Sequence, residues 1–424
     1  MSEEEKKEEQ KEEEQKKEFS FVKEKFKDEL PSGKRLLHKS IKLAGCGVIF
    51  GLAASLAFYA LKPFIEGRFG APPSEVSIPE DEKEQEKQEE QKAEDQEPAT
   101  LTIDNYKELN SILLPVVNTA SKSIVEVRGQ LGDEEWSDTK FDEANSATGI
   151  FMADNGQEVL ILTHGQVLKD AREIQVIFAD NQMYKANVKA QDANLGLAVI
   201  SIAKASISES TWKQIEPATL GNSNMVARGD AIIALGKPHG FAGGMGYGVI
   251  SATKYHMETA DGRCEILNTD MAASAQGTGI LINLNGEVVG IIDPNISSGD
   301  NNNLITAYAV SDIKVQVNSL LNGKRVPFVG IWGVDITEEV AEREKLPKGI
   351  YVKEVVADSP AMAAGIKTGD IITEVAQIDI LTVAGYQRKL LEQQVGDSIR
   401  IAGKRLGNEG YVDIQFDIII GSKE

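Results

Sequence analysis

The sequence predicts a mainly β protein, an antiparallel sandwich or barrel, and two observations support this class. From about residue 123 to residue 326, short β-branched segments alternate with turns rich in Gly, Asn and Asp. Near the end of that region, the Asn285-Gly286 turn separates two apolar runs, 279–283 and 287–292, which is typical of a β-hairpin. The other expected strands are 123–127, 149–152, 159–163, 174–178, 198–202 and 231–235, with a short amphipathic helix at 106–115 before them.

Two strongly charged segments lie ahead of this region. The chain has 424 residues and a formal net charge of −21, and much of that charge falls in residues 1–33 and 71–100. These stretches are rich in Glu, Lys and Gln and contain few apolar side chains, so their burial cannot offset the entropy lost on ordering. We expect residues 1–42 to be a charged tail and residues 63–104 an acidic disordered linker, with acidic docking segments as the alternative interpretation.

An apolar run without charges separates the two charged segments. Residues 43–61 would span about 28 Å as a helix, close to the thickness of the hydrocarbon core of a bilayer, so we predict one transmembrane helix at 43–62. A buried soluble helix and a signal peptide are the alternatives, and the long charged stretch before the run disfavours the second. Basic residues between 34 and 42 predict a cytoplasmic N-terminus, single-pass insertion in the cell membrane and extracytoplasmic C-terminal domains.

Composition excludes several classes of function. The acidic charge argues against nucleic acid as a partner, because phosphate binding needs a cationic surface. The two cysteines, Cys46 and Cys264, would lie in the membrane and outside it, so they form no intrachain disulfide, and no Cys/His cluster indicates a metal. We expect no cofactor. The Gly-rich residues 240–248 lack the context of a phosphate-binding loop and are interpreted as a flexible turn before a strand at 249–251.

Successive segments of the β region resemble one family of proteases. ATGIFM, VLILTHGQVL, LGLAVISI, RGDAIIALGKPHG, GYGVISA and finally NTDMAASAQGTGILINLNGEVVGI follow in the order of the protease domain of the HtrA (Deg) family. The resemblance implies a trypsin-like double β-barrel over residues 105–325. It also implies the family's trimeric assembly and an active HtrA paralogue as possible partners.

The resemblance also assigns positions to the catalytic triad, which holds a general base, an orienting aspartate and a nucleophilic serine. In this sequence those positions are Gln166, Gly196 and Gly277, none of which carries the required group. The nucleophile loop is also one residue shorter than is usual in the family. Nearby rescue candidates are His164, Ser274 and Thr278, with Asp192 as a non-catalytic acid and His239 as a loop residue.

Residues 326–424 resemble the PDZ domains that follow HtrA protease domains, on the match of SPAMAAGIKTGDII at 359–372. The resemblance implies an α+β domain that adds a peptide strand to a sheet edge and receives a C-terminal carboxylate on a loop. That loop should be Phe328, Val329, Gly330 and Ile331, and the facing helix, about 383–394, should carry Tyr386 and Leu390. The alternative is a PDZ fold kept only for packing.

Together these features predict a membrane-anchored HtrA-like pseudoprotease in envelope protein quality control. It would bind extracytoplasmic polypeptide segments, C-terminal peptides or a partner protease without cleaving them. The alternatives are an active HtrA-type serine endopeptidase with a displaced catalytic site and a structural protein whose domains act as spacers.

Overall fold

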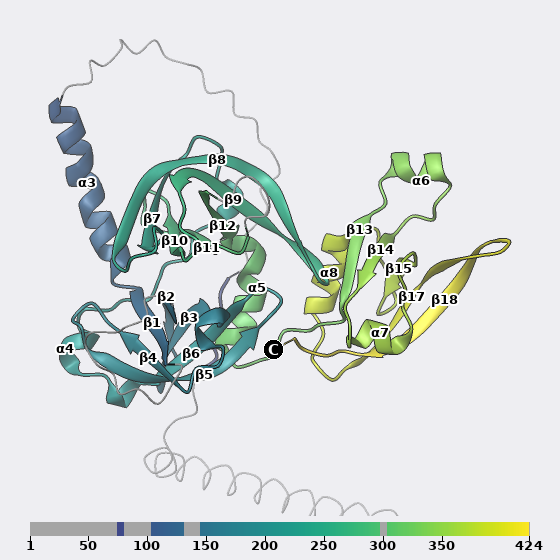
Figure 1. Ribbon diagram of the computed structural model, residues 1–424, viewed down its shortest axis with the longest axis horizontal. Coiled ribbons are helices and arrows are strands. Elements are labelled where there is room, and N and C mark those ends of the chain that lie inside the picture. The colour runs from purple at the N-terminus through teal and green to yellow at the C-terminus, as the bar shows by residue number, and fades with distance from the viewer. Residues whose placement is uncertain (1–73, 80–102, 131–144, 297–302, 424) are drawn as a thin grey trace, which may run out of the picture. The chain divides into compact units, whose positions relative to one another are not determined.

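The computed structural model describes residues 74–79, 103–130, 145–296 and 303–423 (Figure 1). Within these residues no helix is both long enough and apolar enough to cross a membrane. The predicted tail and membrane helix, residues 1–62, lie outside the described part of the chain, and so does most of the predicted linker. The described residues are mainly β, as the sequence predicts, and form two closed barrels followed by a third sheet.

The first barrel contains six antiparallel strands. Each predicted strand in this region is present and extends one to three residues beyond the predicted bounds in at least one direction, while β5 was not predicted. The connections contain a short helix, α4 (Glu209–Trp212), and the 3-10 turns η2 (Gly165–Leu168), η3 (Lys204–Ser206) and η4 (Ser223–Met225). In barrel order the strands are β1 (Ile124–Gln130), β2 (Ser146–Asp154), β3 (Glu158–His164), β6 (Leu197–Ala203), β5 (Met183–Asp192) and β4 (Glu173–Ile177).

The second barrel contains six strands as well and includes the predicted hairpin. Asn283 accepts hydrogen bonds from the backbone of Asn285 and Glu287, and Gly286 has φ +83°, so the Asn-Gly turn forms where the sequence indicates it. In barrel order the strands are β10 (Thr278–Ile282), β11 (Val288–Ile292), β12 (Leu304–Ala309), β9 (Gly262–Ala272), β8 (Gly244–Thr259) and β7 (Ala231–Lys237).

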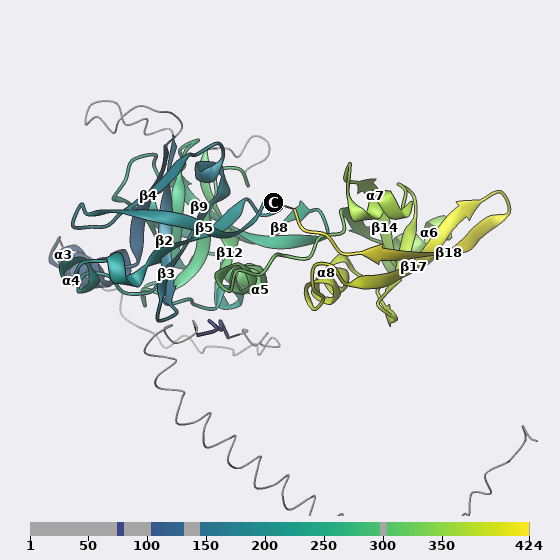
Figure 2. The same ribbon diagram turned by 90° about the horizontal axis from the view of Figure 1, so that it is seen from below.

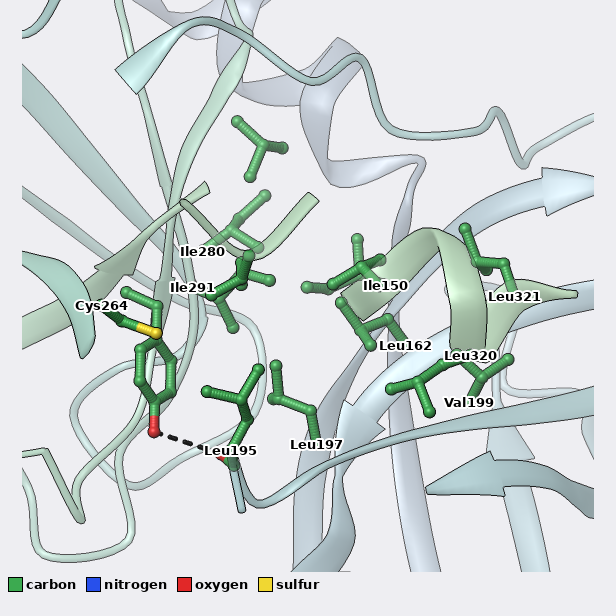
Figure 3. Close-up of a cluster of buried hydrophobic side chains, with 14 of the residues drawn as sticks. Ile150, Leu162, Leu195, Leu197, Val199, Cys264, Ile280, Ile291, Leu320 and Leu321 are labelled. Carbon is green, nitrogen blue, oxygen red and sulfur yellow. Dashed lines mark hydrogen bonds between the residues drawn. The ribbon is translucent and has the colours of Figure 1, made fainter. Parts of the chain in front are cut away.

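One hydrophobic cluster joins the two barrels. Figure 3 shows Ile150 and Leu162 of the first barrel with Ile280 and Ile291 of the second, and Leu320 of α5 (Val310–Leu321) packs in the same cluster. The Tyr308 hydroxyl donates to the Leu195 carbonyl at 3.1 Å, which ties β12 to the β5–β6 turn. The barrels are therefore held as one body by shared burial of apolar side chains.

The helix before the first barrel is longer than predicted. It was expected to end at Pro115, but α3 (Ile103–Ser121) continues through that residue. Proline inside a helix removes one hydrogen bond and is unfavourable by about 3 kcal/mol. Val117, buried after the proline, packs in the core that joins the barrels and offsets part of that loss.

The Gly-rich segment 240–248 is a second correction. Only its first part is a turn, because β8 begins at Gly244 and pairs with β7 from there. Two of its glycines lie close to neighbouring side chains. A Cβ on Gly248 would lie 2.2 Å from Oδ1 of Asp270, and one on Gly246 would lie 2.8 Å from the Met271 sulfur.

The third sheet forms the C-terminal domain, with its own core. Its order is β13 (Ile331–Asp335), β14 (Ile350–Val355), β15 (Ile371–Val375), β17 (Ser398–Gly407) and β18 (Gly410–Ile419), with β16 (Ile378–Asp379) beside β15. Three helices accompany it, α6 (Glu338–Glu344), α7 (Pro360–Ala364) and α8 (Val383–Leu391). Ser359 caps α7 and Gly365 ends it with φ +91°, as the sequence indicates.

Residues 74–79 depart from the expected disordered linker. The backbone N–H groups of Val76 and Ile78 donate to the side chains of Asn322 and Asn318, at 3.0 and 3.2 Å. Both apolar side chains pack against the core that joins the barrels. These hydrogen bonds and the two apolar side chains at alternating positions together place this piece against the end of α5.

Candidate functional site

The chain brings two of the predicted triad positions together. Gln166 lies in the 3-10 turn η2 directly after β3, and Gly196 lies in the turn between β5 and β6. The Gly165 N–H donates to the Gly196 carbonyl at 2.8 Å, which fixes these two turns side by side. Gly196 has φ +69°, a conformation that side chains other than glycine rarely adopt. A residue with an aspartate side chain would therefore be strained at position 196.

The third position, Gly277, is closed to any side chain. A Cβ there would lie 2.4 Å from the Pro238 carbonyl oxygen and 3.0 Å from that of Ser274. The Gly277 N–H also donates to the Ser274 carbonyl at 2.8 Å. The shortened loop thus folds into a tight turn whose backbone fills the space that a nucleophile would need.

A buried histidine and carboxylate lie beneath this region. Nδ1 of His164 is 3.5 Å from Oδ2 of Asp293, and the two side chains are 7% and 3% exposed. Burial alone would raise the pKa of Asp293, but the hydrogen bond to His164, the charge of His164 and the bonds from Asn295 lower it below its ordinary value. Asp293 was not singled out from the sequence, because it follows β11 at the end of a hydrophobic run.

The rescue hydroxyls are engaged elsewhere. Thr278 Oγ1 accepts from the Thr148 N–H at 2.9 Å and donates to the Thr148 hydroxyl at 3.2 Å, across the two barrels. The Ser274 hydroxyl accepts from the Gln276 N–H at 3.3 Å. In the described part of the chain neither hydroxyl is hydrogen-bonded to His164.

Two small cavities line the contact between the barrels. The first, of about 100 Å³, has His164, Gln166 and Thr278 in its wall. The second, of about 130 Å³, has Ser274 and Asp293 in its wall. His164 and Ser274 therefore line different cavities. Neither of these two cavities, both lined by residues that the structure describes, combines a base, an acid and a hydroxyl in the arrangement that acyl transfer requires. The loop residue His239 forms a hydrogen bond from its ring to the Ala272 carbonyl at 3.0 Å. Asp192, expected to be a non-catalytic acid, accepts from the Asn194 N–H at 2.9 Å.

The predicted carboxylate loop of the C-terminal domain does bind a carboxylate. The N–H groups of Val329 and Gly330 donate to Oδ2 of Asp261 at 2.6 and 2.7 Å, and that of Ile331 donates to Oδ1 at 2.9 Å. The Tyr386 hydroxyl donates to the same Oδ1 at 2.8 Å. Burial raises the pKa of Asp261, and these four donors oppose that shift.

The remaining predicted groove residues lie apart from this contact. Phe328 pairs its backbone with Gly421, and Leu390 is 1% exposed within the core of the domain. Gly330 has φ +96°, and a Cβ there would lie 2.3 Å from that of Ser359, so the loop conformation depends on glycine at this position. The prediction that these residues bind a peptide stays a prediction.

Asp261 itself was missed from the sequence. It lies at the tip of the long β8–β9 hairpin, which reaches α8 in both views (Figures 1 and 2). The Asp261-Gly262 pair is a tight-turn signal that could have located the hairpin. No local pattern could have shown that its carboxylate binds a loop some seventy positions later.

Comparison with known proteins agrees with both domains. A trypsin-like peptidase domain family matches residues 147–291, and a PDZ domain family matches residues 327–416. The serine protease Do-like HtrB of Bacillus subtilis is 29% identical over 279 residues, which cover 61% of this chain and 59% of HtrB. The serine protease Do-like HtrA of the same organism is 25% identical over 334 residues, which cover 74% of this chain and 72% of that protein.

Solved structures show the same fold. The structure described as the HtrA-type protease AlgW with tripeptide aligns with a TM-score of 0.53 at 21% identity, covering 74% of this chain and 98% of that one. The order of the two barrels and the PDZ sheet, together with the two domain matches and the Bacillus relatives, leads to one assignment. The chain belongs to the HtrA (Deg) family of trypsin-fold proteins with a C-terminal PDZ domain.

Proposed function

We propose that this chain is a membrane-anchored pseudoprotease of the HtrA family. It binds extracytoplasmic polypeptides or a partner protease in envelope protein quality control, and it does not cleave them. The observation that carries the proposal is the closure of position 277, where the Pro238 carbonyl would lie 2.4 Å from any Cβ. A nucleophile cannot occupy that position unless the loop moves.

The other two triad positions support the same conclusion. Gln166 has no titratable nitrogen, so it cannot accept the proton of a nucleophile near neutral pH. Gly196 offers no carboxylate to orient a base. The two barrels retain a common core, and the PDZ carboxylate loop retains its donors, so the capacity to bind polypeptide is what the chain keeps.

The location is part of the proposal. The apolar run at 43–62 would anchor the chain with its N-terminus in the cytoplasm, so that both domains lie outside the membrane. A homotrimer formed through the start of the protease domain, or assembly with an active HtrA paralogue, would present several PDZ domains at one membrane surface.

The test uses the full-length chain, purified in detergent, and a fluorophosphonate probe that labels serines activated by a working base. We expect no shift in intact mass, whereas an active trypsin-fold protease treated in parallel is labelled fully. In the same samples, fluorescein-labelled unfolded β-casein should show raised anisotropy without fragments on a gel. Stoichiometric labelling or casein fragments would contradict the pseudoprotease, and the absence of both binding and cleavage would favour the spacer function.

An active endopeptidase with a displaced site is the second candidate, and the buried His164–Asp293 pair favours it. This pair supplies a base and an orienting acid, but no hydroxyl of the described residues is hydrogen-bonded to it. If labelling occurs, the variants Ser274→Ala and His164→Gln identify the residues responsible. Loss of labelling in both variants would assign the nucleophile to Ser274 and the base to His164.

A further inference from the structure

The carboxylate loop of the PDZ domain is occupied by the chain itself. The turn that occupies it, residues 260–262, is called here the Asp261 turn. Both side-chain oxygens of Asp261 are used, since Oδ2 accepts from Val329 and Gly330 and Oδ1 accepts from Ile331. Charge-assisted hydrogen bonds of this length are stronger than those between neutral groups. The loop has no further N–H group directed at a second carboxylate among these three residues.

The backbone of the turn adds a further contact. The Asp261 N–H donates to the Ile331 carbonyl at 2.7 Å, at the first residue of β13. In the described sheet β13 pairs with β14 only, so it is an edge strand. A peptide that extends a sheet makes its first hydrogen bonds at such an edge. The Asp261 turn thus makes the two contacts expected of a bound peptide. Its carboxylate occupies the loop, and its backbone N–H forms the first hydrogen bond to the edge strand.

Contacts from both sides hold the turn in place. The Asn194 side chain donates to the Ala260 carbonyl at 2.7 Å, from the protease domain. On the PDZ side, the Gln387 side chain accepts from the Arg263 N–H at 3.1 Å, and the Arg263 guanidinium lies 3.1 Å from Asp335. Asp261 is 5% exposed, so water does not reach its carboxylate freely. The turn is therefore held firmly in the PDZ loop and is not a loose surface contact.

We propose that the Asp261 turn is the resident intramolecular ligand of the PDZ carboxylate loop, and that a peptide with a free C-terminal carboxylate binds only by displacing it. This inference rests on the proposed peptide-binding function. A site that is occupied most of the time binds with an affinity reduced by the fraction of open molecules. If the open form is one molecule in ten, removal of the Asp261 carboxylate tightens peptide binding about tenfold.

The binding experiment compares full-length variants by fluorescence anisotropy. The probe is a fluorescein-labelled pool of decapeptides that end in Val, Leu, Ile or Phe with a free carboxylate, and the same pool with an amidated end is the reference. We expect Asp261→Ala to bind the free-acid pool about tenfold or more tightly than the wild type, and Asp261→Asn to be intermediate. The control Glu258→Ala lies on the same hairpin and removes only an exposed ion pair with Lys353, so it should bind as the wild type does.

Hydrogen exchange without peptide tests occupancy separately. The amides of residues 329–331 should exchange slowly in the wild type and in Glu258→Ala, and quickly in Asp261→Ala. Circular dichroism and melting curves establish that the variants are folded, and Asp261→Asn, which keeps the shape of the side chain, gives a second measurement if Asp261→Ala is unstable.

The outcomes separate the two proposals. Equal exchange in the wild type and Asp261→Ala, or equal and measurable peptide affinity, would overturn the role of the Asp261 turn. If no variant binds either pool while exchange still rises in Asp261→Ala, the occupancy of the loop is supported and the peptide-binding function is contradicted.

Discussion

At Gly277 a backbone carbonyl lies where a side chain would otherwise project. The Pro238 oxygen is 2.4 Å from the position of a Cβ, well inside van der Waals contact, and it belongs to the backbone of another loop. A rigid neighbour of this kind cannot move aside as the end of a flexible side chain can. The family resemblance located this position, but only the packing shows that it is closed.

The substitution Gly277→Ser should therefore lower stability without producing activity. Overpacking at a closed position destabilises by about 1–3 kcal/mol. We expect a melting temperature lower by several degrees and no labelling by the fluorophosphonate probe. Ala275→Ser, which adds the same hydroxyl at an exposed position of the same loop, is the control and should melt as the wild type does. An unchanged melting temperature in Gly277→Ser would show that the loop adapts.

Asp192 provides a prediction on pH. Burial raises its pKa from an ordinary value of 3.8 to about 6, although backbone hydrogen bonds and the charge of Lys423 oppose the shift. Between these two values the folded chain holds a proton that the unfolded chain has released. Lowering the pH from 7.5 to 5 therefore favours folding through this group, and raising the pH through 6 removes that contribution.

Asp192→Asn should remove this pH dependence. The stability of the variant relative to the wild type should be more favourable at pH 7.5 than at pH 5, by about 1.4 kcal/mol. Urea unfolding at the two pH values measures the difference. The exposed substitution Glu409→Gln is the control, with a relative stability that stays the same at both pH values. A constant difference for Asp192→Asn would contradict the assigned shift.

Among the elements, α5 has a second role besides closing the core. Asn322 follows its last turn and accepts the Val76 N–H at 3.0 Å, while its amide donates to the Val76 carbonyl at 2.8 Å. These two bonds and the side chains of Val76 and Ile78 hold residues 74–79 against the protease domain.

Loss of the Asn322 amide should release this segment. Each hydrogen bond contributes about 1 kcal/mol, so Asn322→Ala should raise the exchange rates of the amides of Val76 and Ile78 by tenfold or more. The melting temperature should change little, because the segment lies at the edge of the core. Asn224→Ala, at an exposed position of η4, is the control. Unchanged exchange in Asn322→Ala would mean that apolar packing alone holds the segment.

The elements that could be predicted are those with a local signal. The β10–β11 hairpin was placed to within one residue because the Asn285-Gly286 turn fixes its centre, and α7 because Ser359 and Gly365 mark its ends. β9 was missed, and β8 was predicted only over 249–251, because glycines and exposed polar residues interrupt their alternation. α3 was cut short because the contribution of Val117 to the core is not visible beside Pro115. The pairs His164–Asp293 and Asp261–Ile331 join distant positions, so no local pattern could indicate them.

On the scale of the whole molecule, both barrels and α5 share one core, and Cys264 lies inside it at 0% exposure. Burial, followed by the charges of Asp312 and Asp192, raises the pKa of its thiol to about 12. The reactive species is the thiolate, so the folded protein keeps this residue inert for two independent reasons.

Cys264 can therefore report on opening of the barrel core. In the variant Cys46→Ser, where Cys264 is the only thiol, a disulfide reagent at pH 8 should react slowly and at a rate that rises with urea in step with unfolding. The double variant Cys46→Ser/Cys264→Ala, which has no thiol, is the negative control for labelling. Rapid labelling in the absence of denaturant would contradict a rigid shared core.

The packing around Gly277 also bears on how this chain could change over generations. A return to a serine there improves nothing by itself, because positions 166 and 196 still lack their groups, and it lowers the stability of a protein with only a small margin. The Pro238 loop would have to shift in the same step. In the proposed pseudoprotease, a return to a serine at position 277 is thus hindered by conformation as well as by missing chemistry.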